Sequence, residues 1–525
     1  MMQKALSVHS PKATSREWIG LATIMLPCII YSMDLTVLNL AVPQLSRDLD
    51  PSAVQTLWIM DIYGFMVAGG LITMGTLGDR IGRRKLLMIG AATFGITSLI
   101  AAFAPTAELL ILARALLGIS AATLAPSTLS LIRNMFLDDT QRTFAIGVWV
   151  AGFSAGGAIG PLVGGLVLEH FWWGAVFLIN VPCMVLLLAV APFLLPEYRD
   201  ENAGRLDPLS AAQSVVAVLA VIWALKDIAA HGLNGLAILA LATGLLVGVL
   251  FVRRQFRLPE PLIDMSLFQV PAVRASLVVN MSGVFVLFGA FFFIATYLQL
   301  ALNMGPLESG FWLAPSGAIF ALSSLVTPWL AQRYRPSLII SLGFVLTALG
   351  FTVLAFVETY GEFAVLIGLV LFSLGFSPVA TLTTDLVMTS VAPEKAGQAS
   401  GVSETSFEFG GAMGIAVLGS IFVAIYRRLM DDIPAGLPPE LAERAQRTIA
   451  GAAEAAQTLP GLEGQALLDS ARAAFTQSLA ATAVISAAIA LAVAIFAATV
   501  LRGPHDRSGR ERAARLPAAA PQARS

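Results

Sequence analysis

About fourteen long apolar runs follow one another along this 525-residue chain. The hydrocarbon core of a bilayer is about 30 Å thick, so a helix needs about 20 mainly apolar residues to cross it. Backbone polar groups in lipid must be bonded within the segment, which favours helices over open strands. The runs therefore predict an all-α membrane protein with about fourteen transmembrane helices.

The expected spans follow from where each apolar run begins and ends. They cover residues 18–42, 54–77, 86–104, 107–132, 143–168, 173–195, 208–227, 234–252, 273–300, 309–330, 337–357, 363–390, 398–426 and 475–501. The first run is longer than the apolar core of a signal peptide, which has about 7–15 residues. We therefore expect it to remain as the first membrane helix.

The composition supports this interpretation and excludes several function classes. Only 12% of the residues are charged, against about 25% in a soluble domain. The net charge of −1 gives no basic field for nucleic acid. The cysteines, Cys28 and Cys183, both lie in apolar runs, and the four histidines show no metal-ligand spacing. We expect no disulfide framework, no metal site and no cofactor.

The orientation in the membrane is predicted by the lysine and arginine bias of the short loops. Alternate loops are basic, and cytoplasmic loops are the basic ones. Both tails, 1–17 and 502–525, are then cytoplasmic, and the protein is a multi-pass protein of the cell (inner) membrane. Arg47 is the exception on the opposite side. The basic loops carry Arg80, Arg83, Arg84, Lys85, Arg133, Arg142, Arg199, Arg205, Arg253, Arg254, Arg257, Arg333, Arg335 and Lys395.

Asp34 lies near the middle of the first apolar run. A carboxylate at this depth costs about 2.5–3.5 kcal/mol on insertion scales, so such residues are usually functional. Arg114, in the fourth run, also needs an acidic or backbone partner. Asp34 is one candidate, directly or through water, and a backbone carbonyl is an equal alternative.

Two further acids, Glu404 and Glu408, are four residues apart in the run 398–426 and so share one helix face. Such a pair can hold a proton and release it when a cation arrives. The alternative is a structural pair bonded to neighbouring helices. Phe407 lies between them and is a further candidate for contact with a substrate.

Asp61, in the second run, shares a helix side with Trp58 and Phe65. An acid beside aromatic rings is suited to binding a cation. Aromatic residues are also common at the membrane surface, so an interfacial role is an equal alternative.

The loop between the second and third spans has an ordered pattern of glycines and charges within residues 75–85. A positive-inside loop explains the basic residues, but not this order. Asp79 and the arginines can make charge-assisted contacts with helix ends. The candidate residues for a conformational switch are Gly75, Asp79, Arg80, Gly82 and Arg83.

Glycine recurs at every fourth residue of the fifth span, which makes one smooth helix face. Small residues at this spacing let helices pack closely in lipid, and such packing alone would explain them. A proline within the same stretch can kink the helix. The residues concerned are Gly152, Gly156, Gly160, Pro161, Gly164 and Gly165.

Together these patterns resemble the major facilitator superfamily. The 75–85 loop is similar to its signature between helices two and three, which is tied to switching between inward-open and outward-open states. The Gly-Pro-x-x-Gly-Gly string at 160–165 looks like its antiporter motif. Asp34 and its neighbours resemble the first-helix motif of the 14-span drug:proton antiporters, and Arg114 lies in a further matching motif.

The resemblance implies a domain plan. Two six-helix bundles, 18–195 and 273–501, would be joined by two extra helices at 208–252. A long outer connection, 427–474, would be either a solvated link or a lid; within it, 439–458 and 464–474 can form short amphipathic helices. Proton coupling would fall to Asp34, Arg114, Glu404 and Glu408, and cation binding to Asp34, Trp58, Asp61, Glu404, Phe407 and Glu408.

The implied function is proton-coupled efflux of lipophilic cations, such as quaternary ammonium compounds, cationic dyes and methyl viologen, by a monomer. Some of these relatives carry an acid on span ten, whereas residues 312–318 have none, which disfavours dications. The alternative is export of another solute, such as an endogenous antibiotic or metabolite. A membrane enzyme would need a nucleophile or cofactor constellation, which the sequence does not offer.

Overall fold

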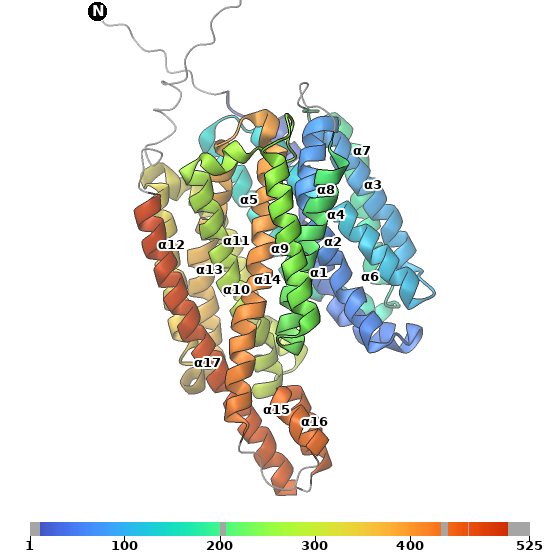
Figure 1. Ribbon diagram of the computed structural model, residues 1–525, viewed down its shortest axis with the longest axis vertical. Coiled ribbons are helices and arrows are strands. Elements are labelled where there is room, and N and C mark those ends of the chain that lie inside the picture. The colour runs from blue at the N-terminus through green and yellow to red at the C-terminus, as the bar shows by residue number, and fades with distance from the viewer. Residues whose placement is uncertain (1–10, 200–205, 432–438, 460, 502–525) are drawn as a thin grey trace, which may run out of the picture.

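The structure, a computed structural model, describes residues 11–199, 206–431, 439–459 and 461–501 (Figure 1). Within these ranges the elements are all helices, and fourteen of them are long and apolar enough to span a membrane. The predicted all-α membrane fold is confirmed.

The first six spans pack together on one side of the molecule. Side-chain caps fix where several of them begin: the side chains of Thr14 and Ser52 form capping boxes, and Thr106 and Asp138 accept from the first turn of their helices. The helices are α1 (Ser15–Leu49), α2 (Ala53–Ile81), α3 (Arg83–Ala102), α4 (Ala107–Met135), α5 (Asp139–His170), and the short α6 (Ala175–Leu178) with α7 (Asn180–Leu194).

A hairpin of two helices follows, α8 (Pro208–His231) and α9 (Gly235–Gln255). In Figure 1 this green hairpin stands between the blue helices and the yellow-to-orange helices. Helix α8 packs against both α2 and α14, so it contacts the early and the late spans at once.

The remaining spans run from α10 to α17. Helix α10 passes into a wider π turn, and Gly361 takes a φ of +52° near the start of α13, a backbone shape that favours glycine. The elements are η1 (Met265–Gln269), α10 (Pro271–Thr296), η2 (Tyr297–Ala301), α11 (Pro306–Arg333), α12 (Pro336–Leu354), α13 (Val357–Thr389), η3 (Pro393–Lys395), α14 (Ala396–Leu429) and α17 (Gly461–Val500).

The long connection after α14 is folded. Residues of the expected 439–458 segment form α15 (Pro439–Arg447) and α16 (Ile449–Thr458), which pack on each other. Helix α15 also contacts α14, and α16 packs on α17. The prediction of a separate short helix at 464–474 is wrong. These residues belong to the start of α17, which continues without a break into the last span. Figure 1 shows this extension at the end of the molecule opposite the label N.

The early and late spans meet closely along α2 and α14. An added Cβ at Gly75 would collide with the carbonyl of Gly397 and would lie 3.4 Å from the Cα of Gly401. Only glycine allows this approach of two backbones. The early and late spans also meet where α5 packs on α11.

Candidate functional site

Asp34 and Arg114 form a buried ion pair between α1 and α4. Arg114 Nη1 donates to Asp34 Oδ2 at 2.5 Å, and the two residues are 1% and 2% exposed. Arg114 Nε also donates to the carbonyl of Ile59 at 3.2 Å. The direct contact predicted from the sequence is therefore present, and so is the backbone carbonyl that was its alternative.

Two residues that the sequence did not single out complete this cluster. Asn180 Nδ2, at the start of α7, donates to Asp34 Oδ1 at 3.3 Å. The Tyr63 ring lies 4.6 Å from the guanidinium carbon of Arg114, a cation–π contact. Within the described residues, the Tyr63 hydroxyl and Asn180 Oδ1 have no hydrogen-bond partner. These buried polar atoms are suited to water-mediated contacts.

Glu404 and Glu408 lie one turn apart on α14, and both side chains are partly exposed. The Tyr31 hydroxyl of α1 donates to Glu408 Oε1 at 3.4 Å. The Tyr31 ring is also 6.3 Å from the Tyr63 ring. Two tyrosines thus connect the Asp34–Arg114 pair to Glu408 of α14.

The two glutamates differ in their partners. Among the described residues, no hydrogen bond or ion pair reaches the Glu404 carboxylate, whereas Glu408 accepts a hydrogen bond from Tyr31. Phe407, between them, packs edge-on against Phe288 at a ring distance of 6.2 Å. Glu404 is therefore the acid that is most available to a cation or a proton.

Asp61 of α2 forms an ion pair with Lys226 of the α8–α9 hairpin. Lys226 Nζ donates to Asp61 Oδ1 at 2.5 Å and lies 4.8 Å from the centre of the Phe65 ring. The Phe65 ring is 6.2 Å from that of Trp58. The acid-and-aromatic surface predicted for a cation is present, and it already holds a cation of the protein itself.

The α2–α3 loop binds the connection between α13 and α14. Asp79 accepts from the backbone N–H of Gly397 at 3.0 Å and of Gln398 at 2.9 Å, and it pairs with Arg83 at 2.7 Å. Arg83 also donates to the carbonyls of Pro393 and Glu394. These contacts tie the early spans to the late spans at this end of the molecule.

Further hydrogen bonds at the same end strengthen this connection. Arg133 donates to the Met388 carbonyl at 3.0 Å. Asp385 of α13 accepts from Arg142 at 3.1 Å and from Thr143 at 2.9 Å. Asp385 is thus part of a contact between α5 and α13.

The glycines of this loop have distinct roles. Gly82 ends α2 with a φ of +110°, and an added Cβ would lie 2.6 Å from the Glu197 carboxylate. Gly75 lies in the close contact with Gly397 described above. Arg80, in the last turn of α2, is half-buried.

The glycine stripe of α5 packs on α1, the helix that carries Asp34. An added Cβ would meet the Ile29 backbone at Gly156, Met33 and Thr36 at Gly160, and Val37 at Gly164, whereas nothing lies within 4 Å at Gly165. The stripe therefore sets the distance between α1 and α5. The side chain of Pro161 lies outside the described residues.

The family model described as Major Facilitator Superfamily matches residues 24–415. The chain belongs to this superfamily. The match includes Asp34, the α2–α3 loop, the α5 glycines and both glutamates of α14.

Several relatives within the superfamily match almost the whole chain. The multidrug efflux pump LfrA of Mycolicibacterium smegmatis is 44% identical over 492 residues, 94% of this chain and 97% of that protein. The methyl viologen resistance protein SmvA of Salmonella typhimurium is 37% identical over 491 residues, 92% of this chain and 98% of that protein. The tetracenomycin C resistance and export protein of Streptomyces glaucescens is 30% identical over 517 residues, 96% of each chain.

A solved structure agrees on the superfamily fold. The human organic anion transporter MFSD10 (TETRAN) matches with a TM-score of 0.58 at 14% identity, covering 90% of this chain and 99% of that chain. At this identity the likeness shows the fold alone.

Proposed function

We propose that this protein is a proton-coupled exporter of lipophilic cations in the cell (inner) membrane, with both termini in the cytoplasm. The observation that carries the proposal is that Glu408 of α14 is linked through Tyr31 to the region of the buried Asp34–Arg114 pair. Tyr31 lies between Glu408 and the Asp34 cluster, and Lys226 of α8 pairs with Asp61 of α2. Intramembrane acids mark proton and ion pathways. The similarity to the multidrug efflux pump LfrA supports drug export, and the similarity to the methyl viologen resistance protein SmvA supports a cationic substrate.

Protons and the cationic substrate compete for the same carboxylates, and this competition couples export of the cation to entry of protons. A carboxylate that binds a proton cannot also neutralise a cation, so protonation discharges the substrate. Glu404 and Glu408 are the acids that change partners, Asp34 with Arg114 couples the proton, and Trp58, Asp61 and Phe407 contact the substrate. Export of a monovalent cation for one proton is electroneutral, and each extra proton adds about 2.3 kcal/mol per 100 mV.

Lys226 acts as an internal cation in this scheme. Its ammonium lies against an acid and an aromatic ring, the surroundings that a lipophilic cation would use. Substrate must therefore displace Lys226 or share the acids with it. The contact of α8 with both α2 and α14 allows the hairpin to respond when the two six-helix bundles, 18–195 and 273–501, move.

The hydrogen bonds of the α2–α3 loop support an outward-facing state. Asp79 and Arg83 hold the early and late spans together at the end that we assign to the cytoplasm, and Gly75 and Gly82 permit that packing. Breaking these bonds would open the cytoplasmic side. Arg80 belongs to the same switch, and the α5 residues Gly156, Gly160 and Gly164 hold α1 during it. We propose that one monomer suffices.

A second candidate is export of an endogenous antibiotic or another solute by the same machinery. The similarity to the tetracenomycin C exporter favours it. Everted membrane vesicles with a substrate panel separate the two. Gradient-driven uptake of ethidium and benzalkonium, weakened unequally by Glu404→Gln, supports cation export. Uptake of tetracenomycin C without either cation would support the second candidate, and equal activity of Glu404→Gln across the panel would make Glu404 structural.

A further inference from the structure

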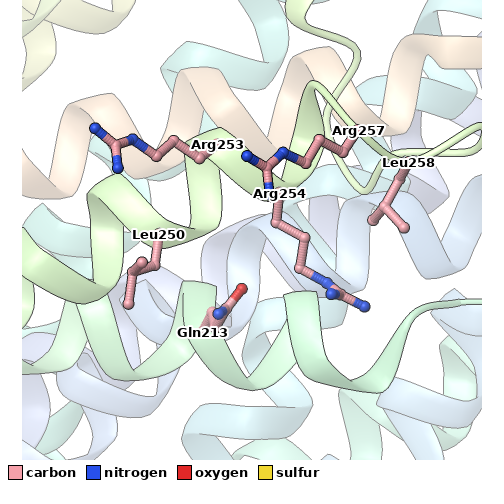
Figure 2. A pocket seen from close by; sticks show the side chains of 6 residues that line it. All are labelled: Gln213, Leu250, Arg253, Arg254, Arg257 and Leu258. Carbon is pink, nitrogen blue, oxygen red and sulfur yellow. The ribbon is translucent and has the colours of Figure 1, made fainter.

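A groove follows the α8–α9 hairpin and has a polar end and an apolar part. The polar end is a pocket of about 310 Å³ lined by Gln213, Leu250, Leu258 and three arginines (Figure 2). The apolar part, of about 450 Å³, is lined mainly by small, aliphatic and aromatic residues that include Ala217, Gly248 and Phe409. Arg253 lines both pockets, so the two adjoin.

The polar end has unbalanced positive charge. Arg254 is neutralised by Asp207, at 2.7 Å and 3.2 Å, and this hydrogen bonding holds the pKa of Asp207 well below its usual range. Arg253 and Arg257 are exposed, and no ion pair with another described residue neutralises them. Figure 2 shows the Arg254 side chain turned away from the other two. Two guanidinium groups therefore remain for an anion.

The apolar part lies on a helix that faces outward. Helix α9 packs mainly on α8, and many of its aliphatic side chains are exposed. At Gly244 an added Cβ would lie 2.7 Å from Val221, so the two helices touch there. At Gly248 the same atom would meet only Ala217, at 3.8 Å, which leaves space above the helix surface.

We propose that this groove binds one anionic phospholipid, with its phosphate at Arg253 and Arg257 and an acyl chain along Gly248. Guanidinium groups match phosphate oxygens in geometry and charge. Basic pockets between membrane helices on the cytoplasmic side bind anionic headgroups. The adjoining apolar part explains why a lipid fits better than a free phosphate. A general positive-inside bias explains the arginines, but not the apolar groove beside them.

The test uses full-length protein in detergent, stripped of lipid, and native mass spectrometry. Phosphatidylglycerol should be retained at least about fivefold more than phosphatidylcholine with the same acyl chains, a difference of about 1 kcal/mol. Glycerol phosphate at the same concentration should not displace it. Equal retention of both lipids would overturn the proposal. Displacement by glycerol phosphate would instead make this an adventitious or free-phosphate site.

Variants distinguish binding of the lipid headgroup from binding of its acyl chain. Arg253→Gln with Arg257→Gln should abolish the preference for phosphatidylglycerol, and the two lysine substitutions should keep part of it. Gly248→Leu should weaken retention of both lipids, because it fills the groove and leaves the arginines in place. The matched control, Arg274→Gln with Arg335→Gln, removes two exposed arginines elsewhere. Equal losses in the control would refute the site.

Discussion

The Tyr31 hydroxyl of α1 donates a hydrogen bond to Glu408 of α14 at 3.4 Å. This bond joins the first span to the thirteenth, and the Tyr31 ring is also near Tyr63, which stacks on Arg114. Glu408 is thereby connected to the Asp34–Arg114 pair through two aromatic residues. The connection is absent from any local sequence motif.

Tyr31→Phe tests this connection by removing one oxygen atom. A hydrogen bond to a charged group is worth about 1.5–3 kcal/mol, and this one is long. We expect substrate-driven proton flux in proteoliposomes to fall about fivefold to tenfold, while ethidium binding without a gradient stays near that of the wild type. Tyr334→Phe, on an exposed tyrosine, is the control. Unchanged proton flux in Tyr31→Phe would remove Tyr31 from the coupling.

Lys226→Met removes the internal cation beside Asp61. The side chains of this ion pair are 34% and 38% exposed, so its contribution belongs in the range of about 0.2–1 kcal/mol. We expect the KM for a monovalent cation to fall by up to about fivefold, because the ammonium no longer competes. Lys226→Arg should keep the wild-type KM. A KM that rises in Lys226→Met would show that Lys226 supports substrate binding rather than opposing it.

Asp34→Asn leaves Arg114 as an unpaired buried charge. Breaking such a pair costs about 3–5 kcal/mol, so the melting temperature should fall and coupled transport should be lost. Asp34→Asn with Arg114→Gln should regain much of the stability but no coupling. The control is Asp48→Asn, at an exposed acid of the same helix. Recovery of proton-coupled transport in the double variant would make Asp34 purely structural.

Asp79→Asn weakens the contacts that close the α2–α3 end. Loss of charge-assisted bonds worth about 1.5–3 kcal/mol should favour opening there. The readout is maleimide labelling of Ser400→Cys, a buried position of α14, in protein lacking Cys28 and Cys183. Labelling should rise about tenfold or more. Lys85→Gln, an exposed charge beside the same loop, should leave labelling unchanged. Equal labelling in Asp79→Asn would show that Asp79 does not hold this end closed.

The fold was predictable because hydrophobic length and glycine spacing are local properties. Each span is recognisable in the sequence as an apolar run, and the spans found in the structure overlap those expected. The sequence predicts that the last span starts at residue 475, whereas α17 begins at Gly461. Its first turns are amphipathic and lie beside α16, so a hydropathy average does not detect them.

The candidate site was predictable only in part. Asp34, Glu404 and Glu408 stand out because acids are costly in an apolar run. Tyr31 lies three residues before Asp34, on the same helix face, but a tyrosine carries no such cost. Lys226 lies at the end of the expected span 208–227, and its partner Asp61 comes from another helix. Pairings of this kind depend on tertiary packing, which no single-helix pattern contains.

The central claim is exchange of cations for protons, and reconstituted protein tests it most directly. Proteoliposomes with an imposed pH gradient would be monitored for proton movement as ethidium, benzalkonium or methyl viologen is added. We predict that the two monovalent cations trigger proton movement, that methyl viologen does so more weakly, and that Asp34→Asn responds to none of them. No proton movement with any of the three, in protein shown to be folded, would contradict the proposal.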